Sequence, residues 1–236
     1  MNGKLLLSSA IGSIHEGWAY TVRRTVDWRV HPNTITVAGT GLQLFTAWVF
    51  STGYWTTAGI LLIFAGLLDA LDGAVARQSG KETAFGAFLD STLDRISDLA
   101  LFAGVMACYA FQWNWTYAGL AFYGGATAVL ISYSKARAEN LITDCKVGLA
   151  QRPERIALLA VAGIFHSMGV GLWLIAVFNT LTLIERILYT YQRTSRRRIP
   201  AQDLQRIVFL DFDRESPAYA ILALICLLLL VLGGIA

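Results

Sequence analysis

Residues 68–98 read LDALDGAVARQSGKETAFGAFLDSTLDRISD, and this stretch decides the fold. Asp69 and Asp72 are three residues apart, so they share one face of a helix. Asp90 and Asp94 are four residues apart and share a face in the same way. Long apolar runs lead into the stretch and out of it. The pattern predicts two antiparallel helices whose short connection brings the two pairs of carboxylates together.

The composition of the whole chain indicates a membrane protein. Of its 236 residues, 56% are hydrophobic and 15% are charged. In a typical soluble domain about a quarter of the residues are charged. The net charge of +3 is too small to predict binding to nucleic acid. The three cysteines have no paired spacing, which argues against a disulfide framework or a cysteine-bound metal.

Seven stretches are apolar enough to be membrane spans, which need about 20 residues. They cover residues 33–52, 55–77, 86–110, 116–135, 155–168, 171–192 and 217–235, and the fifth is short. The predicted fold class is an all-α polytopic membrane protein. It comprises a six-helix transmembrane bundle, an additional C-terminal transmembrane helix and an N-terminal interfacial helix.

The placement of charge predicts the orientation of these spans. The turns proposed at 51–54, 110–116 and 167–172 contain no lysine or arginine. Basic residues concentrate on the cytoplasmic side of membrane proteins, so these turns are predicted to lie outside. The N-terminus and the aspartates are then predicted to face the cytoplasm, in the cell membrane.

Four segments are predicted along the chain. Residues 1–30 mix apolar and polar side chains, which indicates an interfacial amphipathic helix, with a disordered tail as the alternative. Residues 31–195 are predicted to form the catalytic transmembrane domain. Residues 196–215 are predicted to be a charged cytoplasmic linker, and residues 216–236 the additional transmembrane helix.

Four carboxylates at the ends of two membrane helices indicate a metal site. Ionisable groups in spans usually mark function, and like charges repel unless a cation lies between them. Oxygen ligands suit hard cations such as Mg²⁺ or Mn²⁺, which commonly bridge carboxylates to phosphates. Asp98 continues the acidic stripe and is interpreted as orienting the cluster. The alternative is a salt-bridge network with Arg77 and Arg95, which leaves four acids against two bases.

The spacing of the acids resembles a family signature. It reads Asp69-x-x-Asp72-Gly73-x-x-Ala76-Arg77, then eight residues, then Gly86-x-x-x-Asp90-x-x-x-Asp94. All eight positions match the signature of the CDP-alcohol phosphotransferases. The core of that family has six spans, so the segment at 217–235 departs from its pattern.

The resemblance implies a reaction and the residues that carry it. The phosphatidyl group of CDP-diacylglycerol, or the corresponding group of an ether-lipid analogue, passes to an alcohol, and CMP leaves. The resemblance also implies two Mg²⁺ or Mn²⁺ ions, a homodimer and Asp94 as general base. The implied metal ligands are Asp69, Asp72, Asp90 and Asp94. The implied contacts with the CDP-lipid are Thr34, Gly73, Ala76, Arg77, Thr83 and Gly86.

A second polar cluster predicts that the acceptor alcohol carries a phosphate, which arginine binds through two hydrogen bonds. Residues 132–156 read SYSKARAENLITDCKVGLAQRPERI. This segment resembles the bacterial phosphatidylinositol-phosphate synthases and their archaeal ether-lipid counterparts. The resemblance implies inositol 1-phosphate as the acceptor, with glycerol 3-phosphate as the alternative. The residues implied to hold it are Ser132, Lys135, Arg137, Arg155 and Arg193.

Other polar residues receive structural interpretations. Lys146 and Arg152 are interpreted as inner-side charges that follow the usual cytoplasmic bias of basic residues. Glu185 and Arg186 are expected to face the interior of the bundle. His166 is expected to be a packed or interfacial side chain.

Two other classes of membrane protein also use acidic motifs. An intramembrane prenyltransferase binds a diphosphate through Mg²⁺, but it needs neither the Gly73 and Ala76-Arg77 pattern nor bases for a phosphorylated acceptor. A cation transporter would place its acids near the midplane, often within inverted repeats. The acids of this chain are predicted toward the inner end of the spans, and the sequence has no internal repeat.

Overall fold

The computed structural model describes residues 32–79, 83–142, 145, 147–148 and 151–194, and for residues 70–79 it gives the course of the helix alone. The described residues form six α-helices and no strand. The helices are α2 (Pro32–Ser51), α3 (Trp55–Ser79), α4 (Ala84–Phe111), α5 (Trp115–Glu139), α6 (Arg152–Ile164) and α7 (Met168–Thr194).

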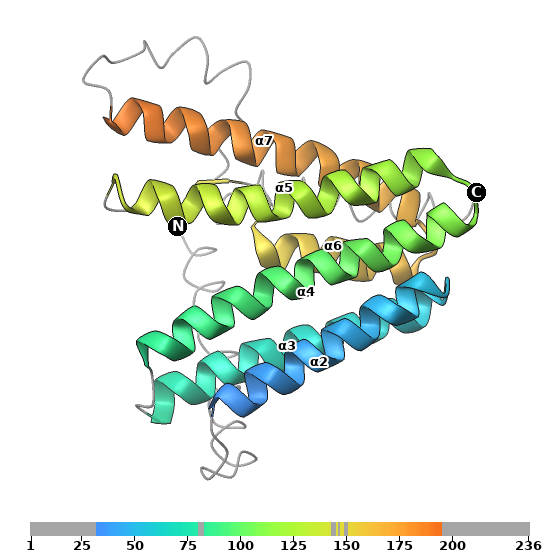
Figure 1. Ribbon diagram of the computed structural model, residues 1–236, viewed down its shortest axis with the longest axis horizontal. Helices are drawn as coiled ribbons and strands as arrows, with labels where there is room; N and C mark the ends of the chain where they lie inside the picture. Colours follow the sequence, from blue (N-terminus) through green and yellow to red (C-terminus); the bar gives the residue numbers. More distant parts are fainter. Residues whose placement is uncertain (1–31, 80–82, 143–144, 146, 149–150, 195–236) are drawn as a thin grey trace, which may run out of the picture.

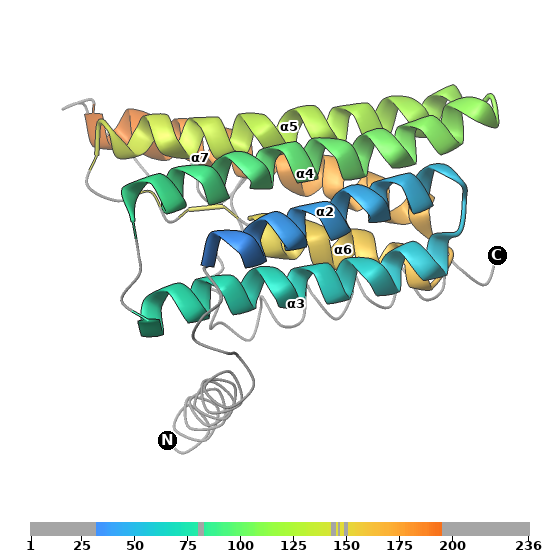
Figure 2. The same ribbon diagram turned by 60° about the horizontal axis from the view of Figure 1, so that its bottom comes forward.

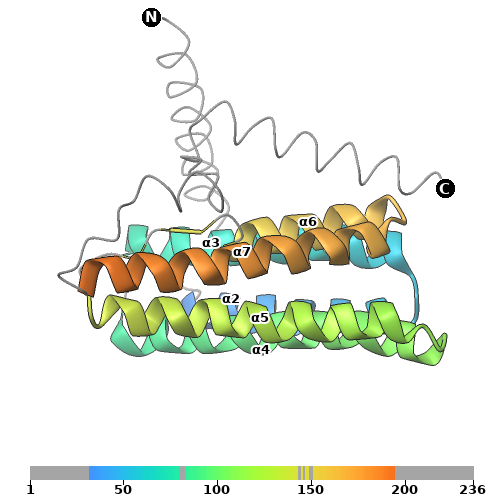
Figure 3. The same ribbon diagram turned by 90° about the horizontal axis from the view of Figure 1, so that it is seen from above.

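The helices run side by side in two layers of three (Figures 1 and 3). One layer holds α2, α4 and α5, and the other holds α3, α6 and α7. Contacts between α2 and α3 and between α5 and α7 join the layers at both edges. The helices therefore form a closed ring in the order α2, α4, α5, α7, α6, α3, which Figure 2 shows from another side.

Three tight turns, at 52–54, 112–114 and 165–167, lie at one end of the bundle, which we call the turn end (Figure 1). Backbone hydrogen bonds close these turns, and Trp113 and His166 adopt positive φ angles of 58° and 52° within them. With 13 residues, α6 is the shortest helix, whereas α7 has 27. At 1.5 Å per residue α6 is about 20 Å long, so it begins part-way along the bundle at Arg152 and ends at the turn end.

Small residues allow the helices to approach closely. A Cβ added to Gly104 would lie 2.1 Å from the carbonyl oxygen of Ala47, so α2 and α4 meet backbone to backbone. A Cβ on Gly59 would lie 2.5 Å from the carbonyl oxygen of Ala160, which fixes the distance between α3 and α6. Such contacts are typical of helices that pack within a membrane.

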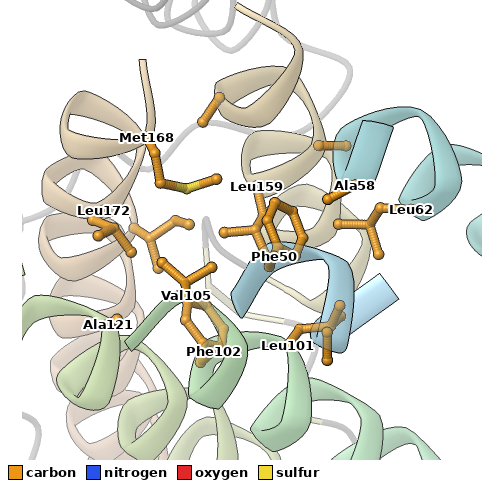
Figure 4. Close-up of a cluster of buried hydrophobic side chains, with 14 of the residues drawn as sticks. Phe50, Ala58, Leu62, Leu101, Phe102, Val105, Ala121, Leu159, Met168 and Leu172 are labelled. Carbon is orange, nitrogen blue, oxygen red and sulfur yellow. The ribbon is translucent and has the colours of Figure 1, made fainter. Parts of the chain in front are cut away.

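An apolar core fills the half of the ring nearer the turn end (Figure 4). Every helix contributes to it, and its fully buried members include Phe50, Leu62, Leu101, Val105, Ala121, Leu159 and Leu172. The core leaves the opposite half of the interior for polar groups.

The six helices confirm the predicted helical core, although their ends differ from the predicted bounds by up to four residues. Residues 167–172 were predicted to form a turn, but α7 begins at Met168. The glycines there do not stop the helix, because Gly169 lies against the ring of Tyr117, which leaves no room for a side chain. The fifth span was predicted to start at residue 155, but α6 begins at Arg152.

Among the described helices, Met168–Thr194 alone is long and apolar enough by length and composition to cross a membrane. Trp55–Asp69 is a shorter apolar stretch, and charged residues interrupt α4 within its first four turns. The predictions for residues 1–30, 196–215 and 216–236, and for Lys146, lie outside the described residues.

Candidate active site

Three of the predicted metal ligands come together in the interior of the ring. Asp69 is supplied by α3, and Asp90 and Asp94 by consecutive turns of α4. Each offers a carboxylate oxygen within 4.8 Å of the oxygens offered by the other two. Asp72 stands one turn beyond Asp69 on α3, in the part for which only the course of the helix is described.

The chemistry of these ligands fits a hard divalent cation. All three groups are half-buried carboxylates, and oxygen ligands are those that Mg²⁺ and Mn²⁺ prefer. Mg²⁺ lies about 2.0–2.1 Å from each ligand, so two oxygens on one ion are separated by up to about 4 Å. Small side-chain rotations would bring the three oxygens into that range.

Arg152, at the start of α6, is the main partner of these acids. Its guanidinium donates from Nη1 to Asp69 at 2.7 Å and forms an ion pair through Nη2 with Asp94 at 2.8 Å. It also donates from Nε to Asp98 at 3.3 Å and from Nη2 to Gln43 of α2 at 3.4 Å. The interpretation of Arg152 as an ordinary inner-side charge was wrong, because the short α6 places this residue inside the ring.

Asp98 connects the acid cluster to a second arginine. Its side chain is 5% exposed and accepts hydrogen bonds from Arg152 and from Nη2 of Arg155, the latter at 3.3 Å. The predicted alternative was a salt-bridge network with Arg77 and Arg95. Arg95 donates to the Ser91 carbonyl of its own helix, the described ion pairs of these acids are with Arg152 and Arg155, and the side chain of Arg77 lies outside the described part of the chain.

A cavity of about 290 Å³ adjoins the acid cluster. Among the described lining residues, five are basic and three are acidic. The charged ones are Asp94, Arg95, Asp98, Lys135, Glu139, Arg152, Arg155 and Arg186. The excess of basic groups favours an anion in this cavity, next to a site suited to a cation.

The residues predicted to hold the acceptor phosphate divide into two groups. Ser132, Lys135 and Arg155 line the cavity, and Arg155 is 2% exposed. Lys135 also forms an ion pair of 3.8 Å with Glu139. Arg137 and Arg193 are exposed and are not among the described lining residues. The guanidinium of Arg193 lies 5.3 Å from the centre of the Tyr189 ring.

The residues predicted to contact the CDP-lipid lie on α2, α3 and α4. Thr34 is exposed in the first turn of α2. Thr83 caps α4, since its hydroxyl accepts a hydrogen bond of 2.9 Å from the N–H of Gly86. Gly73, Ala76 and Arg77 follow the first acid pair on α3, where only the course of the helix is described.

Arg186 holds the α5–α6 connection beside the cavity through hydrogen bonds. It is buried and donates to the carbonyl of Ile131 on α5, and from Nη2 to the carbonyl of Val147 at 3.0 Å. Gly148 follows with a φ of 119°, and a Cβ there would lie 2.4 Å from the side chain of Thr182. The expectation that Arg186 faces the interior is confirmed.

Sequence reasoning missed Arg152 and Gln43 as members of this site. Arg152 and Arg155 are three residues apart, so the spacing rule applied to the aspartates would have placed both on one face of α6. Gln43 is 3% exposed and lies in an apolar run, and nothing in the sequence around it distinguishes it.

Comparison with known proteins gives this arrangement a context. Residues 29–185 match the CDP-alcohol phosphatidyltransferase family. The chain is 35% identical over 159 residues to the archaetidylinositol phosphate synthase of Pyrococcus horikoshii, an alignment covering 67% of this chain and 82% of that protein.

Two crystal structures of the phosphatidylinositol phosphate synthase of Mycobacterium tuberculosis have a similar fold. The structure with CDP-DAG bound has a TM-score of 0.68 and 31% identity, covering 73% of this chain and 92% of that chain. The complex with manganese and citrate has a TM-score of 0.66 and 31% identity, covering 74% of this chain and 88% of that chain. Together with the described carboxylates, the second structure supports a divalent cation at the acid cluster.

Proposed function

The chain belongs to the CDP-alcohol phosphatidyltransferase family, and we propose that it transfers the phosphatidyl or archaetidyl group of a CDP-linked lipid to inositol 1-phosphate, releasing CMP. The rival classes, an intramembrane prenyltransferase and a cation transporter, are contradicted by this membership. The observation that carries the choice of acceptor is the predominantly basic cavity beside Asp94.

Asp94 is proposed as the general base. An alcohol is a weak nucleophile until a base accepts its proton, and Asp94 lies both in the acid cluster and in the wall of the cavity. The acceptor oxygen forms a bond to the lipid-linked phosphorus while its proton passes to Asp94. The bond from that phosphorus to the oxygen it shares with the cytidylyl phosphate breaks, and CMP leaves with this oxygen.

The aspartates are proposed to hold the divalent cations, as Asp69, Asp72, Asp90 and Asp94. When bound, such ions neutralise charge that develops on the diphosphate during an in-line displacement. The chain itself holds the reacting groups in position, which is the larger part of catalysis for phosphoryl-type transfers. Thr34, Gly73, Ala76, Arg77, Thr83 and Gly86 remain the proposed contacts with the CDP-lipid.

Ser132, Lys135 and Arg155 are proposed to bind the phosphate of the acceptor. All three line the cavity, and the pairing of Arg155 with Asp98 fixes the direction of its guanidinium. Small-ligand pockets measure roughly 300–1,000 Å³, so a cavity of about 290 Å³ suits one small polar molecule. Arg137 and Arg193, which are exposed, are proposed as weaker contributors at the entrance.

The proposal includes the membrane arrangement. The six helices form the transmembrane bundle, residues 216–236 add a further transmembrane helix, a homodimer forms, and the acid cluster faces the cytoplasm, where basic residues concentrate. Exposed aromatic side chains at the turn end, Tyr54, Trp113 and Trp115, suit the opposite membrane interface.

The test measures CMP release by the purified protein with Mg²⁺ or Mn²⁺ and CDP-diacylglycerol or its ether analogue. Inositol 1-phosphate, free inositol, glycerol 3-phosphate and serine are supplied separately. Turnover is expected with inositol 1-phosphate, whereas turnover with glycerol 3-phosphate alone would refute the acceptor. If none of the four acceptors leads to CMP release, the proposed reaction is refuted.

Two variants test the roles of individual residues. Asp94→Asn should retain nucleotide binding and lose turnover, and a near-normal rate would refute Asp94 as the base. Arg155→Ala should raise the acceptor KM far more than the KM of the CDP-lipid. Arg137→Ala removes the same charge from an exposed position on α5 and should have a smaller effect on the acceptor KM.

A further inference from the structure

Arg152 occupies the space between two of the carboxylates proposed to bind the cation. Its Nη1 lies 2.7 Å from one oxygen of Asp69 and its Nη2 lies 2.8 Å from one oxygen of Asp94. One planar guanidinium therefore bridges two helices, α3 and α4, from the start of a third, α6. Both distances are those of charge-assisted hydrogen bonds, the strong class of such bonds.

A bridging guanidinium and a bridging divalent cation exclude each other at this position. A cation that binds Asp69 Oδ2 and Asp94 Oδ1 must lie between these two oxygens, which the two Nη atoms already contact. Close positive charges also repel strongly in a half-buried site, where the effective dielectric constant is well below that of water. The cation can take these oxygens only when Arg152 gives them up.

We infer that Arg152 is a positioning residue that holds Asp69 and Asp94 before the divalent cation binds and turns toward the anion-binding cavity when it does. This inference rests on the proposed function, because it assumes that these carboxylates bind a divalent cation. Arg152 already lines that cavity, so its guanidinium can face an anion there without leaving the site once the carboxylates release it.

The arrangement couples the two binding events. A released guanidinium adds a positive group to a cavity already lined by Lys135 and Arg155, so a bound cation strengthens the binding of an anion. Linkage is reciprocal, so an anion in the cavity must strengthen the binding of the cation by the same factor. The anion expected there is a phosphate group or a chemically similar oxyanion.

The test measures Mn²⁺ binding to purified full-length protein without lipid substrate, from the loss of the electron paramagnetic resonance signal of free Mn²⁺. Arg152→Gln should bind Mn²⁺ about tenfold more tightly or better, since breaking one charged hydrogen bond is worth about that factor. Arg137→Gln is the matched control. It removes the same charge from an exposed position on α5 that is not among the described lining residues of the cavity, and should change the affinity by less than about threefold.

Two further measurements keep the inference falsifiable if Arg152→Gln folds poorly. Arg152→Lys keeps the charge but lacks the planar fork, so it should bind Mn²⁺ more tightly than the wild type by a smaller factor. Sulfate, compared with chloride at equal ionic strength, should tighten Mn²⁺ binding to the wild type and not to Arg152→Gln.

The outcomes separate this inference from the proposed function. Equal or weaker Mn²⁺ binding by both Arg152 variants, with normal binding by the wild type, would overturn the inference alone. An equal effect of sulfate on wild type and Arg152→Gln would overturn the coupling. If the Mn²⁺ results are as expected and no acceptor releases CMP, the proposed function fails and the inference stands.

Discussion

The buried carboxylate of Asp98 offers a direct test of the polar interior. Its two oxygens accept hydrogen bonds from Nε of Arg152 and from Nη2 of Arg155, each at 3.3 Å. Asp98→Asn keeps the size of the side chain but replaces one acceptor oxygen with an amide that donates. The buried guanidinium of Arg155 and the half-buried one of Arg152 would then face a neutral group in place of a carboxylate.

The magnitude follows from these contacts. Breaking a buried ion pair by removing one partner costs about 3–5 kcal/mol. The two bonds of 3.3 Å are long for charge-assisted hydrogen bonds, and Arg152 keeps Asp69 and Asp94 as partners. The expected loss in the free energy of unfolding is therefore at the lower end, about 3 kcal/mol. For a chain of this size each kcal/mol lowers Tm by about 2–4 °C, so the apparent Tm should fall by roughly 6–12 °C.

The assay uses the buried free thiols of Cys108 and Cys145. A dye that becomes fluorescent on reaction with thiols reports unfolding in detergent, with EDTA present so that no divalent cation contributes. Glu139→Gln is the control, because its 3.8 Å pair with Lys135 is 43% exposed on both sides and is worth at most about 1 kcal/mol. An Asp98→Asn protein that melts no earlier than Glu139→Gln would refute the reasoning.

Three further predictions use other parts of the chain. Gly104→Ala should destabilise the protein by about 1–3 kcal/mol, because the new Cβ would lie 2.1 Å from the Ala47 carbonyl oxygen. Gly66→Ala is the control and should not destabilise the protein, because a Cβ there has no atom within 4 Å. Equal Tm values for the two variants would contradict the described α2–α4 contact. Thr83→Ala should cost about 1 kcal/mol through loss of the α4 cap and Thr83→Ser should restore it, while an unchanged Tm would show that the cap is not important. Removal of divalent cations with EDTA should abolish CMP release and Mn²⁺ should restore it; activity that persists in EDTA would contradict a metal-dependent reaction.

Most of the helical core was predictable, because apolar stretches of suitable length are separated by short polar or glycine-containing turns. The error at residues 167–172 arose because Gly169 and Gly171 were treated as breaks. A glycine does not by itself end a helix. Here Gly169 lies within α7, where the absence of a side chain allows close contact with the ring of Tyr117. Sequence patterns record which residues are small but not which neighbour requires them to be small.

The aspartates were identified because their spacing is itself geometric information, since residues three and four apart share a helix face. The acceptor residues were implied by resemblance, which gave both Arg155, which is buried, and Arg137, which is exposed, without showing the burial of either. Only Ala136 lies between Lys135 and the exposed Arg137 on α5, and a separation of two positions turns the two side chains to different faces of the helix.

Depth along the bundle was a further signal that the sequence contained. Asp69 lies fourteen residues from the start of α3, Asp98 thirteen residues from the end of α4 and Arg152 twelve residues from the end of α6. At 1.5 Å per residue, all three are therefore about 20 Å from the turn end. Counting from the three predicted turns would have placed Arg152 level with the acids, although it would not have shown which way it faces.

Stability alone does not account for a polar network at this depth. Buried ion pairs are often no more stabilising than apolar side chains of the same size, because removing charges from water costs about as much as their attraction returns. The apolar core of Leu101, Leu159 and Leu172 lies in the same ring and shows that the fold accommodates such packing. Asp98, Arg152 and Arg155 replace that packing with charge, while the half of the bundle at the turn end remains apolar. We therefore infer that the apolar half of the interior stabilises the ring, whereas the charged half is retained to position the groups proposed to bind a cation and an anion.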